Sequence, residues 1–330
     1  MSIADRRISD LKKEIGGYLE LEEASGREYY EDLYRVNLGR TAFLLLLRTR
    51  QIRKIYMPYF LCESVFQVCR ENDTEMIFYY LSEELEPVLP QGAPEEGTYV
   101  YLVNYYGCLT EDKIRYYKKK FGNIIVDNTQ AFYDRPVEGI DTIYSCRKFF
   151  GVGDGAYLAT DAQPDMDLPE DHSMEHMAHV LGRYEYDAGT YYQRMLDTAA
   201  GFGSSGVRRM SRLTENLLKT IDYEGIKRKR EANYRLLAEL LPSGSPFNGE
   251  IPEGPFAYPY YHRNGIELRR WLAGKKIFVP TNWKNVLRDL KADTLEYQWS
   301  ENILPVPCDQ RYGREEMEYI AACIKEWEAL

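Results

Sequence analysis

A carboxylate and a lysine follow two apolar runs of the sequence, at places where strands are expected to end. Asp127 comes directly after the run NIIV, where a partly desolvated carboxylate is costly unless it is paired. Lys148 comes shortly after the run DTIY and precedes the glycine-rich stretch Gly151–Gly155. Pyridoxal phosphate (PLP) needs both residue types, because a lysine forms its Schiff base and a carboxylate keeps its ring nitrogen protonated. The pair is therefore a candidate for a PLP site, in which Lys148 would form the Schiff base.

The phosphate of such a cofactor also needs hydrogen-bond donors, and Gly39, Arg40 and Thr41 stand at the start of an expected helix. Backbone N–H groups and the positive end of a helix bind phosphate well. Each feature alone has an ordinary interpretation, since strand-end aspartates commonly form turns, lysines there commonly face solvent, and helix starts commonly serve as caps. Their order along the chain is what indicates a single site.

Apolar strands alternate with amphipathic helices through the first part of the chain. The alternation is typical of an α/β fold in which a mostly parallel sheet is sandwiched by helices. In such sheets ligands bind at the carboxyl ends of the strands. Helices are expected at residues 40–51, 62–72 and 111–121, and strands at 54–60, 75–81, 98–107, 123–128, 141–146 and 155–160.

Two domains are expected, divided in a stretch rich in Pro, Gly and Ser that runs from Pro242 to Gly254. Residues 1–241 would form a large PLP-binding domain, with a polar, helix-prone lead-in at its start and a helical region from Asp171 to Leu241. Residues 242–330 would form a small C-terminal α+β domain. Its strands are expected at 255–261 and 303–307 and its helices at 265–274 and 313–330, and the lead-in covers residues 1–36.

Composition and charge limit the partners of the chain. Its 330 residues include 42 Lys and Arg against 52 Asp and Glu, and this formal net charge of −10 argues against nucleic acid as the main partner. The first residues lack the apolar run of a signal peptide, and the longest apolar run, Ala42–Leu47, is too short to span a bilayer. The six cysteines form no CxxC pair, so no zinc ribbon is evident. We expect a cytoplasmic protein with no membrane partner.

Several motifs resemble those of the DegT/DnrJ/StrS family of PLP-dependent sugar aminotransferases, across nearly the whole chain. The most specific are Val126–Ala131, similar to the family's Glu-Asp-Ala-Ala-Gln-Ala, and Ser145–Lys148 with Gly153–Ala156, similar to its Ser…Lys…Gly-Asp-Gly-Gly. The supporting matches are the phosphate turn at Leu38–Ala42, the strand end Ile55–Pro58, Asn104–Gly107 against His-x-Tyr-Gly, Arg209–Ser211 with Ile226–Tyr234, and Leu304–Pro307 with the closing helix.

The resemblance implies the type I fold of PLP transferases, a homodimer, and an aminotransferase reaction. An amino group would pass from a small-molecule donor to a keto sugar, most commonly nucleotide-linked, while Asp127 pairs with the pyridine nitrogen and Gln130 contacts the ring face or O3′. The implied site consists of catalytic Lys148, cofactor-binding Gly39, Arg40, Thr41, Cys62, Asp127, Gln130 and Ser145, and substrate-binding Tyr59, Asn104 and Tyr105.

Departures from the family's pattern keep two alternatives open. The spacing from Ser145 to Lys148 is shorter than the family's, and Cys62 falls where the family commonly places an aromatic residue on the cofactor ring. Asn104 replaces the histidine of His-x-Tyr-Gly, and Val207 or Arg208 replaces an asparagine that reaches across the dimer. The chain would then be a non-transaminating PLP enzyme, such as a dehydratase, or a degenerate protein that only binds PLP.

A different class of function is suggested by three histidines. His172, His176 and His179 are spaced at i, i+4 and i+7, which is one face of a helix if the stretch is helical. Three imidazoles, with Asp171 or Glu175 nearby, could hold Zn²⁺ or Ni²⁺. The stretch is no HExxH motif, however, and a solvated polar helix start is the ordinary interpretation.

Overall fold

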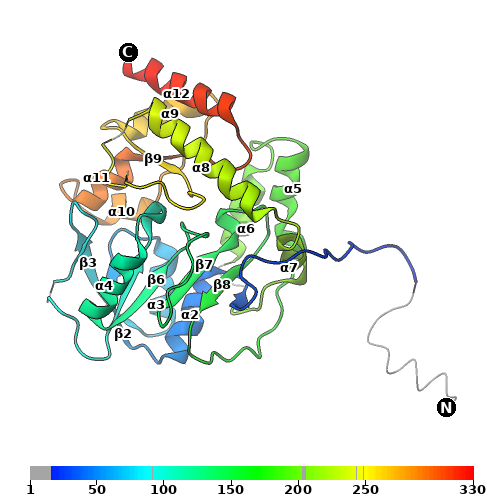
Figure 1. The fold of residues 1–330 in the computed structure, drawn as a ribbon, viewed down its shortest axis with the longest axis vertical. Coiled ribbons are helices and arrows are strands. Elements are labelled where there is room, and N and C mark those ends of the chain that lie inside the picture. The colour runs from blue at the N-terminus through cyan, green and yellow to red at the C-terminus, as the bar shows by residue number, and fades with distance from the viewer. Residues whose placement is uncertain (1–15, 91, 203–205, 243, 248) are drawn as a thin grey trace.

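The computed structural model describes residues 16–90, 92–202, 206–242, 244–247 and 249–330 (Figure 1). Its centre is an eight-stranded sheet with the order β1-β8-β7-β6-β5-β2-β3-β4. The strands from β3 through β2, β5 and β6 to β7 run parallel, whereas β1, β8 and β4 run antiparallel to their neighbours. The predicted mostly parallel sheet is confirmed. The strands are β1 Tyr34–Val36, β2 Lys54–Pro58, β3 Glu75–Leu81, β4 Pro87–Val88, β5 Tyr99–Val103, β6 Asn123–Asp127, β7 Asp141–Ser145 and β8 Ala156–Ala159.

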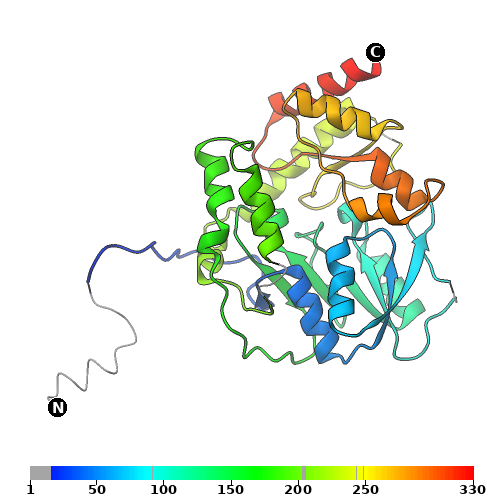
Figure 2. The ribbon, with the colours of Figure 1, turned by 180° about the vertical axis from the view of Figure 1, so that it is seen from behind.

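The central strands are buried because helices cover both faces of the sheet. In β5 and β6 every residue after the first is buried, which explains their near-continuous apolar sequences YVYLV and NIIVD. Helix α4 (Glu111–Phe121) lies over one face, and α2 (Gly39–Thr49) and α3 (Glu63–Glu71) lie over the other (Figures 1 and 2). The three helices were predicted from their amphipathic patterns, and the predictions are confirmed.

Helix α4 shows how the sequence fixes an element that was predicted to the residue. The Thr110 hydroxyl accepts a hydrogen bond from Lys113 N at the N-cap, and the first turn is acidic while the last turn is basic. Both charge arrangements are favourable to the helix dipole. Gly122, with φ of 77°, ends the helix in a conformation that a residue with a Cβ rarely adopts.

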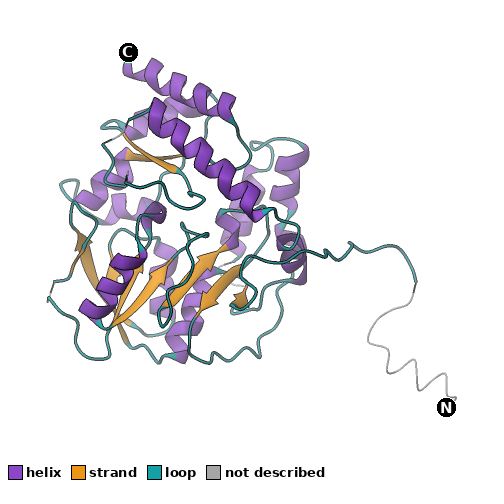
Figure 3. Ribbon diagram, in the orientation of Figure 1, coloured by secondary structure: helices purple, strands orange, loops and turns teal. Residues whose placement is uncertain are grey.

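After β8 the chain becomes helical, as expected between Asp171 and Leu241. A two-helix hairpin, α5 and α6, stands beside the edge of the sheet, and α8 is the longest helix (Figure 3). No residue of α6 is buried. The elements here are the 3₁₀ turn η3 Ser173–His176, α5 Ala178–Glu185, α6 Tyr192–Gly201, α7 Arg212–Leu218 and α8 Tyr223–Leu240.

The C-terminal part contains a second, two-stranded antiparallel sheet surrounded by helices. Its core also includes Tyr234, Leu237 and Leu241 at the end of α8, so α8 packs here although it precedes the expected boundary. Conversely, Val286 and Trp299 pack into the core of the large sheet. The division between residues 241 and 242 therefore stays a proposal. The elements are β9 Tyr258–Tyr261, α9 Gly265–Gly274, α10 Lys284–Asp289, α11 Leu295–Asn302, β10 Ile303–Val306 and α12 Arg314–Glu328.

The lead-in differs from its prediction, in so far as it lies within the described residues. Residues 16–33 form no helix, and β1 follows them at the edge of the sheet, antiparallel to β8. Side chains fix this segment: Tyr30 OH donates to Phe132 O at 2.7 Å, and Arg35 forms an ion pair with Glu28 at 3.1 Å. Tertiary contacts override local helix propensity here. Among the described residues, no helix is both long enough and apolar enough to cross a membrane.

Candidate active site

The carboxyl ends of β6 and β7 bring Asp127 beside the turn that carries Lys148. Asp127 lies opposite Ile143 of β7, and Asn128 N donates to Ile143 O at 2.8 Å. The Asp127 carboxylate is buried, and its Oδ1 accepts from Thr129 N at 2.8 Å while its Oδ2 accepts from Tyr101 OH at 2.9 Å. Each oxygen of an ionised carboxylate has a second acceptor position. Asp127 is therefore anchored and can still accept a hydrogen bond from a ligand.

The electrostatics of Asp127 connect it to Lys148. Burial raises the pKa of Asp127, whereas hydrogen bonds from Thr129 and Tyr101 and the positive charge of Lys148 lower it. Such a charge effect requires that the two groups lie near each other. The two residues that the sequence predicted as a pair are thus brought together by neighbouring strands.

Lys148 ends a short 3₁₀ turn, Cys146–Lys148, that follows β7 directly. Its side chain is exposed, and its Nζ lies 5.6 Å from the centre of the Phe256 ring. No carboxylate of the described residues forms an ion pair with it. An amine that is accessible and unpaired is suited to covalent attachment of a carbonyl group.

The turn behind Lys148 is held from the C-terminal part of the chain. Phe149 O accepts from Gln310 Nε2 at 2.7 Å and from Arg230 Nη2 at 3.2 Å. Arg230 is 2% exposed, and its Nη1 also donates to Pro255 O at 2.9 Å. The sequence singled out Arg230 only as part of a basic helical motif. Its position shows that it braces the backbone next to Lys148.

The start of α2 lies over the ends of β6 and β7. A Cβ placed on Gly39 would lie 3.5 Å from Thr129 Cγ2 and 3.8 Å from Ile143 Cγ2. Leu38 occupies the N-cap and provides no side-chain cap, and the first turn contains no acidic residue. The first N–H groups of this helix, including those of Gly39, Arg40 and Thr41, are therefore available to an anion.

Two arginines add positive charge at this place. Arg40 is in the first turn of α2, and Arg147 directly precedes Lys148. Burial lowers the pKa of Arg147, and the charge of Arg40 lowers it further, so the two guanidinium groups lie near each other. Neither forms an ion pair with a carboxylate of the described chain. The sequence predicted Arg40 as a cofactor contact but missed Arg147, because only the fold shows that the two approach.

Three other predicted residues are engaged in internal contacts. Gln130 is buried, and its Oε1 accepts from Tyr106 N at 3.0 Å. Asn104 Nδ2 donates to Asn128 Oδ1 at 3.1 Å and to Asp134 Oδ2 at 2.8 Å, and burial raises the pKa of Asp134 to about 7. Tyr105 OH donates to Phe60 O at 2.7 Å in the core. These contacts join the loop after β5 to the loop after β6 and to Phe60, so any role in binding substrate stays a prediction.

The remaining predicted site residues are Ser145, Cys62 and Tyr59. Ser145 ends β7 and is partly exposed, three residues before Lys148. Cys62 is exposed at the N-cap of α3, with its Sγ 3.2 Å from Ser64 Oγ, and it is among the groups that affect the pKa of Arg40 in α2. Tyr59 stacks on Phe78 of β3 at a ring distance of 4.9 Å, toward the far edge of the sheet.

The glycine-rich stretch before β8 has a structural explanation. Gly155 has φ of 113°, and a Cβ there would lie 2.9 Å from Thr214 Cγ2. The buried Asp154 carboxylate accepts from Ser211 N at 2.8 Å and Ser211 Oγ at 2.7 Å, and also from the Thr214 hydroxyl. Two motifs that were read separately, Gly-Asp-Gly and Arg-Met-Ser, are thus in direct contact and tie the sheet to α7.

A cavity of about 650 Å³ opens at Lys148, between the large sheet and the C-terminal part; we call it the Lys148 cavity. Its volume is within the range of small-molecule sites. Arg147, Arg230, Phe256 and His179 are among its lining residues. Sequence reasoning did not connect His179 with Lys148, since thirty-one positions separate them and only the packing of α5 brings them to one cavity.

The structure does not place the three histidines on one helix face, as the metal interpretation requires. His172 precedes the 3₁₀ turn η3, His176 ends it, and His179 lies in α5, so the three do not share one regular helix face. His176 instead packs on Phe202 at a ring distance of 4.4 Å. Among the described residues, no group of three or more His, Cys, Asp and Glu side chains could hold a metal ion.

The residues present fit PLP. The donor set contains an exposed, unpaired amine at Lys148, a buried carboxylate at Asp127 that can accept another hydrogen bond, and an uncapped helix start flanked by Arg40 and Arg147. The amine suits the aldehyde of PLP, the carboxylate suits its protonated ring nitrogen, and the helix start suits its phosphate.

Comparison with known proteins gives a clear result for structure and none for sequence. No family model matches this chain, and no curated protein is similar to it. DesV of S. venezuelae, solved in complex with a ketimine intermediate, has a TM-score of 0.63 at 16% identity, covering 89% of this chain and 84% of that chain. A DegT DnrJ EryC1 StrS aminotransferase from Brucella abortus has a TM-score of 0.61 at 16% identity, covering 90% and 86%.

A third solved structure is the putative sugar aminotransferase Spr1654 from Streptococcus pneumoniae in its PLP form. It has a TM-score of 0.59 at 14% identity, with coverage of 88% of this chain and 85% of that chain. The chain therefore has the fold of the DegT/DnrJ/StrS-type sugar aminotransferases, as its motifs predicted. Fold alone does not determine function, which has to be argued from the site.

Proposed function

We propose that the protein is a PLP-dependent aminotransferase that passes an amino group from a small-molecule donor to a keto sugar, nucleotide-linked as the motifs imply. One observation carries the proposal. Asp127 and Lys148 come from the ends of neighbouring parallel strands, near enough for the charge of Lys148 to lower the pKa of Asp127. Both lie by the uncapped start of α2. The shared fold of sugar aminotransferases supports the same conclusion.

Each residue of the site has a distinct task in this proposal. When bound, PLP supplies a ring that accepts electrons from the substrate. Lys148 Nζ would hold the cofactor and, once an amino donor has released it, move the proton that transamination relocates. The Asp127 carboxylate would keep a proton on the ring nitrogen. Arg40, Arg147 and the N–H groups of Gly39 to Thr41 would hold the phosphate.

The visible absorption spectrum tests the function directly. The purified protein with added PLP is expected to be yellow, and a panel of amino acids that includes glutamate and glutamine should contain a donor that bleaches the band while releasing its keto acid. A yellow protein that no donor bleaches would favour the non-transaminating alternative. A protein that binds no PLP at saturating concentration would contradict both.

We also propose a homodimer, with the helical hairpin α5–α6 in the interface. No residue of α6 is buried, and the hairpin exposes large apolar or aromatic side chains, including Leu181 at 54%, Tyr184 at 90% and Leu196 at 41%. Exposed patches of this kind mark interaction sites, and soluble proteins most commonly assemble as twofold dimers. The cytoplasmic location and the absence of nucleic-acid and membrane partners, expected from composition, belong to the same proposal.

Sedimentation velocity at micromolar concentration should therefore give the mass of a dimer. Leu196→Glu is expected to shift the protein toward the monomer, because it places a charge in the apolar contact. Arg115→Ala, an exposed change on α4, is the matched control and should leave the mass unchanged. A monomeric parent that carries bound PLP would contradict the proposal.

A further inference from the structure

Residues 17–23, which we call the N-terminal arm, expose their apolar side chains to water. Tyr18 is 98% exposed, Leu19 is 92% exposed and Leu21 is 58% exposed. Tyr18 and Leu19 are more exposed than any other large apolar side chain that the structure describes. Apolar surface in water is unfavourable, and exposed apolar side chains that lie together mark interaction sites. The arm is therefore a candidate for contact with another molecule.

The base of the arm is fixed to α7. Ala24 N donates to Asn216 Oδ1 at 2.7 Å, and Asn216 Nδ2 donates to Glu22 O at 2.9 Å. A Cβ on Gly26 would collide with Lys219 O, so the backbone passes directly over the end of this helix. From α7 the arm leads away from the body of the molecule, on the side where the hairpin α5–α6 stands (Figures 1 and 2). The arm thus starts from a defined place and points away from its own chain.

The sequence of the arm gives it two different sides. After Gly17 it reads Tyr-Leu-Glu-Leu-Glu-Glu, so apolar and acidic side chains alternate. In an extended segment, neighbouring side chains point to opposite sides. Leu19 and Leu21 therefore share one side, and Glu20 and Glu22 share the other. A surface that receives the arm must offer apolar groups to the first side and positive charge to the second.

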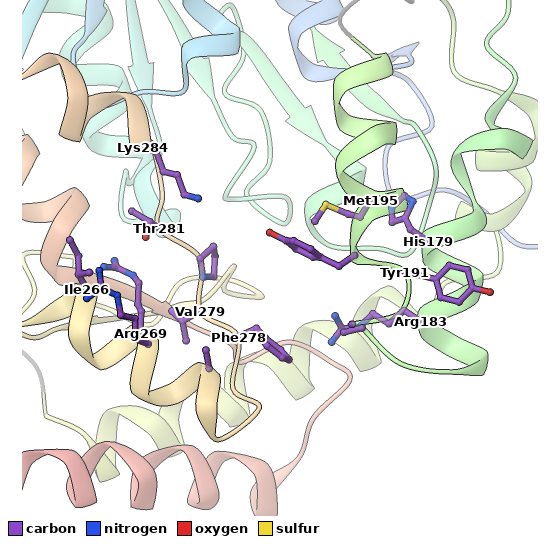
Figure 4. Close-up of a pocket in the computed structure, with 16 residues that line it drawn as sticks. His179, Arg183, Tyr191, Met195, Ile266, Arg269, Phe278, Val279, Thr281 and Lys284 are labelled. Carbon is purple, nitrogen blue, oxygen red and sulfur yellow. The ribbon is translucent and has the colours of Figure 1, made fainter.

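A cavity of about 860 Å³ offers this combination between the hairpin α5–α6 and the C-terminal part; we call it the hairpin cavity. Figure 4 shows its two walls. The hairpin wall includes Tyr192 and Met195, and the opposite wall, from α9 and the segment 278–284, includes Arg269 and Lys284. Among the described residues no aspartate or glutamate lines the cavity, and its arginines and lysine are Arg183, Arg269, Arg270 and Lys284.

These four cations form no ion pair with a carboxylate in the ranges that the structure describes. Arg183 donates to Tyr312 OH at 3.3 Å. Arg269 is 7% exposed and donates to backbone carbonyls, while its buried Nε has no hydrogen-bond partner. The chain as a whole has a formal net charge of −10, so a concave surface without acidic side chains is an exception in this protein. Such a surface attracts an acidic segment.

A second copy of the chain is the molecule that would bring an arm to this cavity. In a twofold dimer both copies place the same elements at the contact. If the hairpin is in that contact, as proposed above, the arm of each copy leaves its α7 beside the hairpin of the other copy. Residues 17–22 reach about 20 Å beyond the base when extended. The cavity of the arm's own chain is a poorer receiver, because the base on α7 directs the arm outward (Figures 1 and 2).

We propose that the N-terminal arm of one copy docks over the mouth of the hairpin cavity of a second copy, with its leucines against the hairpin wall and its glutamates toward the cations of the opposite wall. The inference rests on the proposed homodimer and is independent of the proposed aminotransferase activity. The hairpin cavity and the Lys148 cavity share the lining residues His179, Arg183, Phe278 and Pro280. A docked arm therefore closes the outer end of the passage to Lys148, and the second copy supplies a wall of that passage.

Photo-crosslinking of the full-length protein tests the inference. Tyr18→p-benzoylphenylalanine keeps an aromatic ring at the most exposed side chain of the arm and makes it reactive to light. A crosslink between two copies doubles the mass of the chain on a denaturing gel, whereas a crosslink within one copy does not. We expect the doubled mass, with the adduct mapped by mass spectrometry to residues 178–201 or 265–284. Tyr116→p-benzoylphenylalanine, at a position that is 52% exposed on α4, is the matched control and should give no adduct in these ranges.

Charge reversal tests the wall that receives the glutamates. Arg270→Glu/Lys284→Glu places like charges opposite the arm and should lower the yield of the crosslinked dimer about fivefold or more. Adding Glu22→Lys/Glu23→Lys to this variant should restore the yield, which would not happen if the first change had merely unfolded the cavity. Arg115→Glu/Lys119→Glu, an exposed double reversal on α4, is the control and should leave the yield unchanged.

Sedimentation velocity separates this inference from the proposed homodimer. A dimer whose Tyr18 probe gives no doubled mass, or gives adducts only outside residues 178–201 and 265–284, would overturn the inference and leave the homodimer standing. A monomer would overturn both. A yield of crosslinked dimer that the double reversal Arg270→Glu/Lys284→Glu does not change would overturn the role of the cations in receiving the arm.

Discussion

Lys148→Ala abolishes the borohydride-stable attachment of PLP to the protein and its visible band. The expected loss follows from the placement of Lys148, the exposed and unpaired amine beside Asp127. Activity in any donor half-reaction should fall by about 10²–10⁴-fold or more, because the group that moves the proton is lost together with the attachment. Mass spectrometry of peptides after borohydride reduction measures the adduct and identifies the lysine that carries it.

The fold should tolerate this change. Lys148 is exposed and forms no ion pair among the described residues, and substitutions of this kind alter the free energy of unfolding by about 0.5 kcal/mol or less. A loss of the adduct with an unchanged thermal midpoint would thus report chemistry rather than unfolding. Lys119→Ala on α4, an exposed lysine over a different part of the sheet, is the control and should keep the adduct. An adduct on any lysine other than Lys148 would refute the site.

Much of the fold follows from sequence patterns that are long and regular. β5 and β6 are apolar runs buried between two layers of helices, and α4 has a capping threonine, a charge gradient and a terminal glycine. The three-residue strand β1 was missed, because its pairing with β8 depends on side chains far away in the sequence. Helices α10 and α11 were also missed, since six and eight residues give too little periodicity to read.

In the candidate site, too, some residues could be predicted from the sequence and others could not. Asp127 and Lys148 could be predicted because each stands at a strand end, and parallel neighbours put such ends together. Arg147 and His179 could not, because their roles depend on the approach of α2 and α5, which no local pattern encodes. Asn104 and Tyr105 occupy motif positions, yet the polar atoms of Asn104 bond to Leu109 after β5 and to Asp134 after β6, and the Tyr105 hydroxyl bonds to Phe60. A motif shows where a residue stands in the fold but not what its side chain contacts.

Asp127→Asn weakens PLP binding by about 10–100-fold and removes transamination. The parent carboxylate is expected to accept a charge-assisted hydrogen bond from the ring nitrogen, worth roughly 1.5–3 kcal/mol, and the amide cannot hold a proton there. Asparagine keeps an oxygen for Thr129 N and can donate its amide to Tyr101 OH, so the local fold survives. Asp127→Ala, in contrast, leaves both partners buried and unpaired, which costs stability as well as affinity. Fluorescence titration of PLP measures the affinity of each variant.

Two comparisons and a pH profile make the prediction specific to Asp127. Thr41→Ala should weaken PLP less, because the phosphate keeps its backbone donors and both arginines, and Cys62→Phe should leave PLP unchanged or tighten it by about 1 kcal/mol of stacking. Burial raises the pKa of Asp127, so lowering the pH protonates the carboxylate, and the affinity of the parent for PLP should fall through that pKa. The phosphate of PLP ionises in the same way for both proteins, but Asp127→Asn lacks the carboxylate. The affinity of this variant for PLP should therefore not show the pH dependence that protonation of Asp127 causes in the parent. If Asp127→Asn keeps the parent's affinity, pH profile and transamination, the ring nitrogen has another partner and the assignment of Asp127 is wrong.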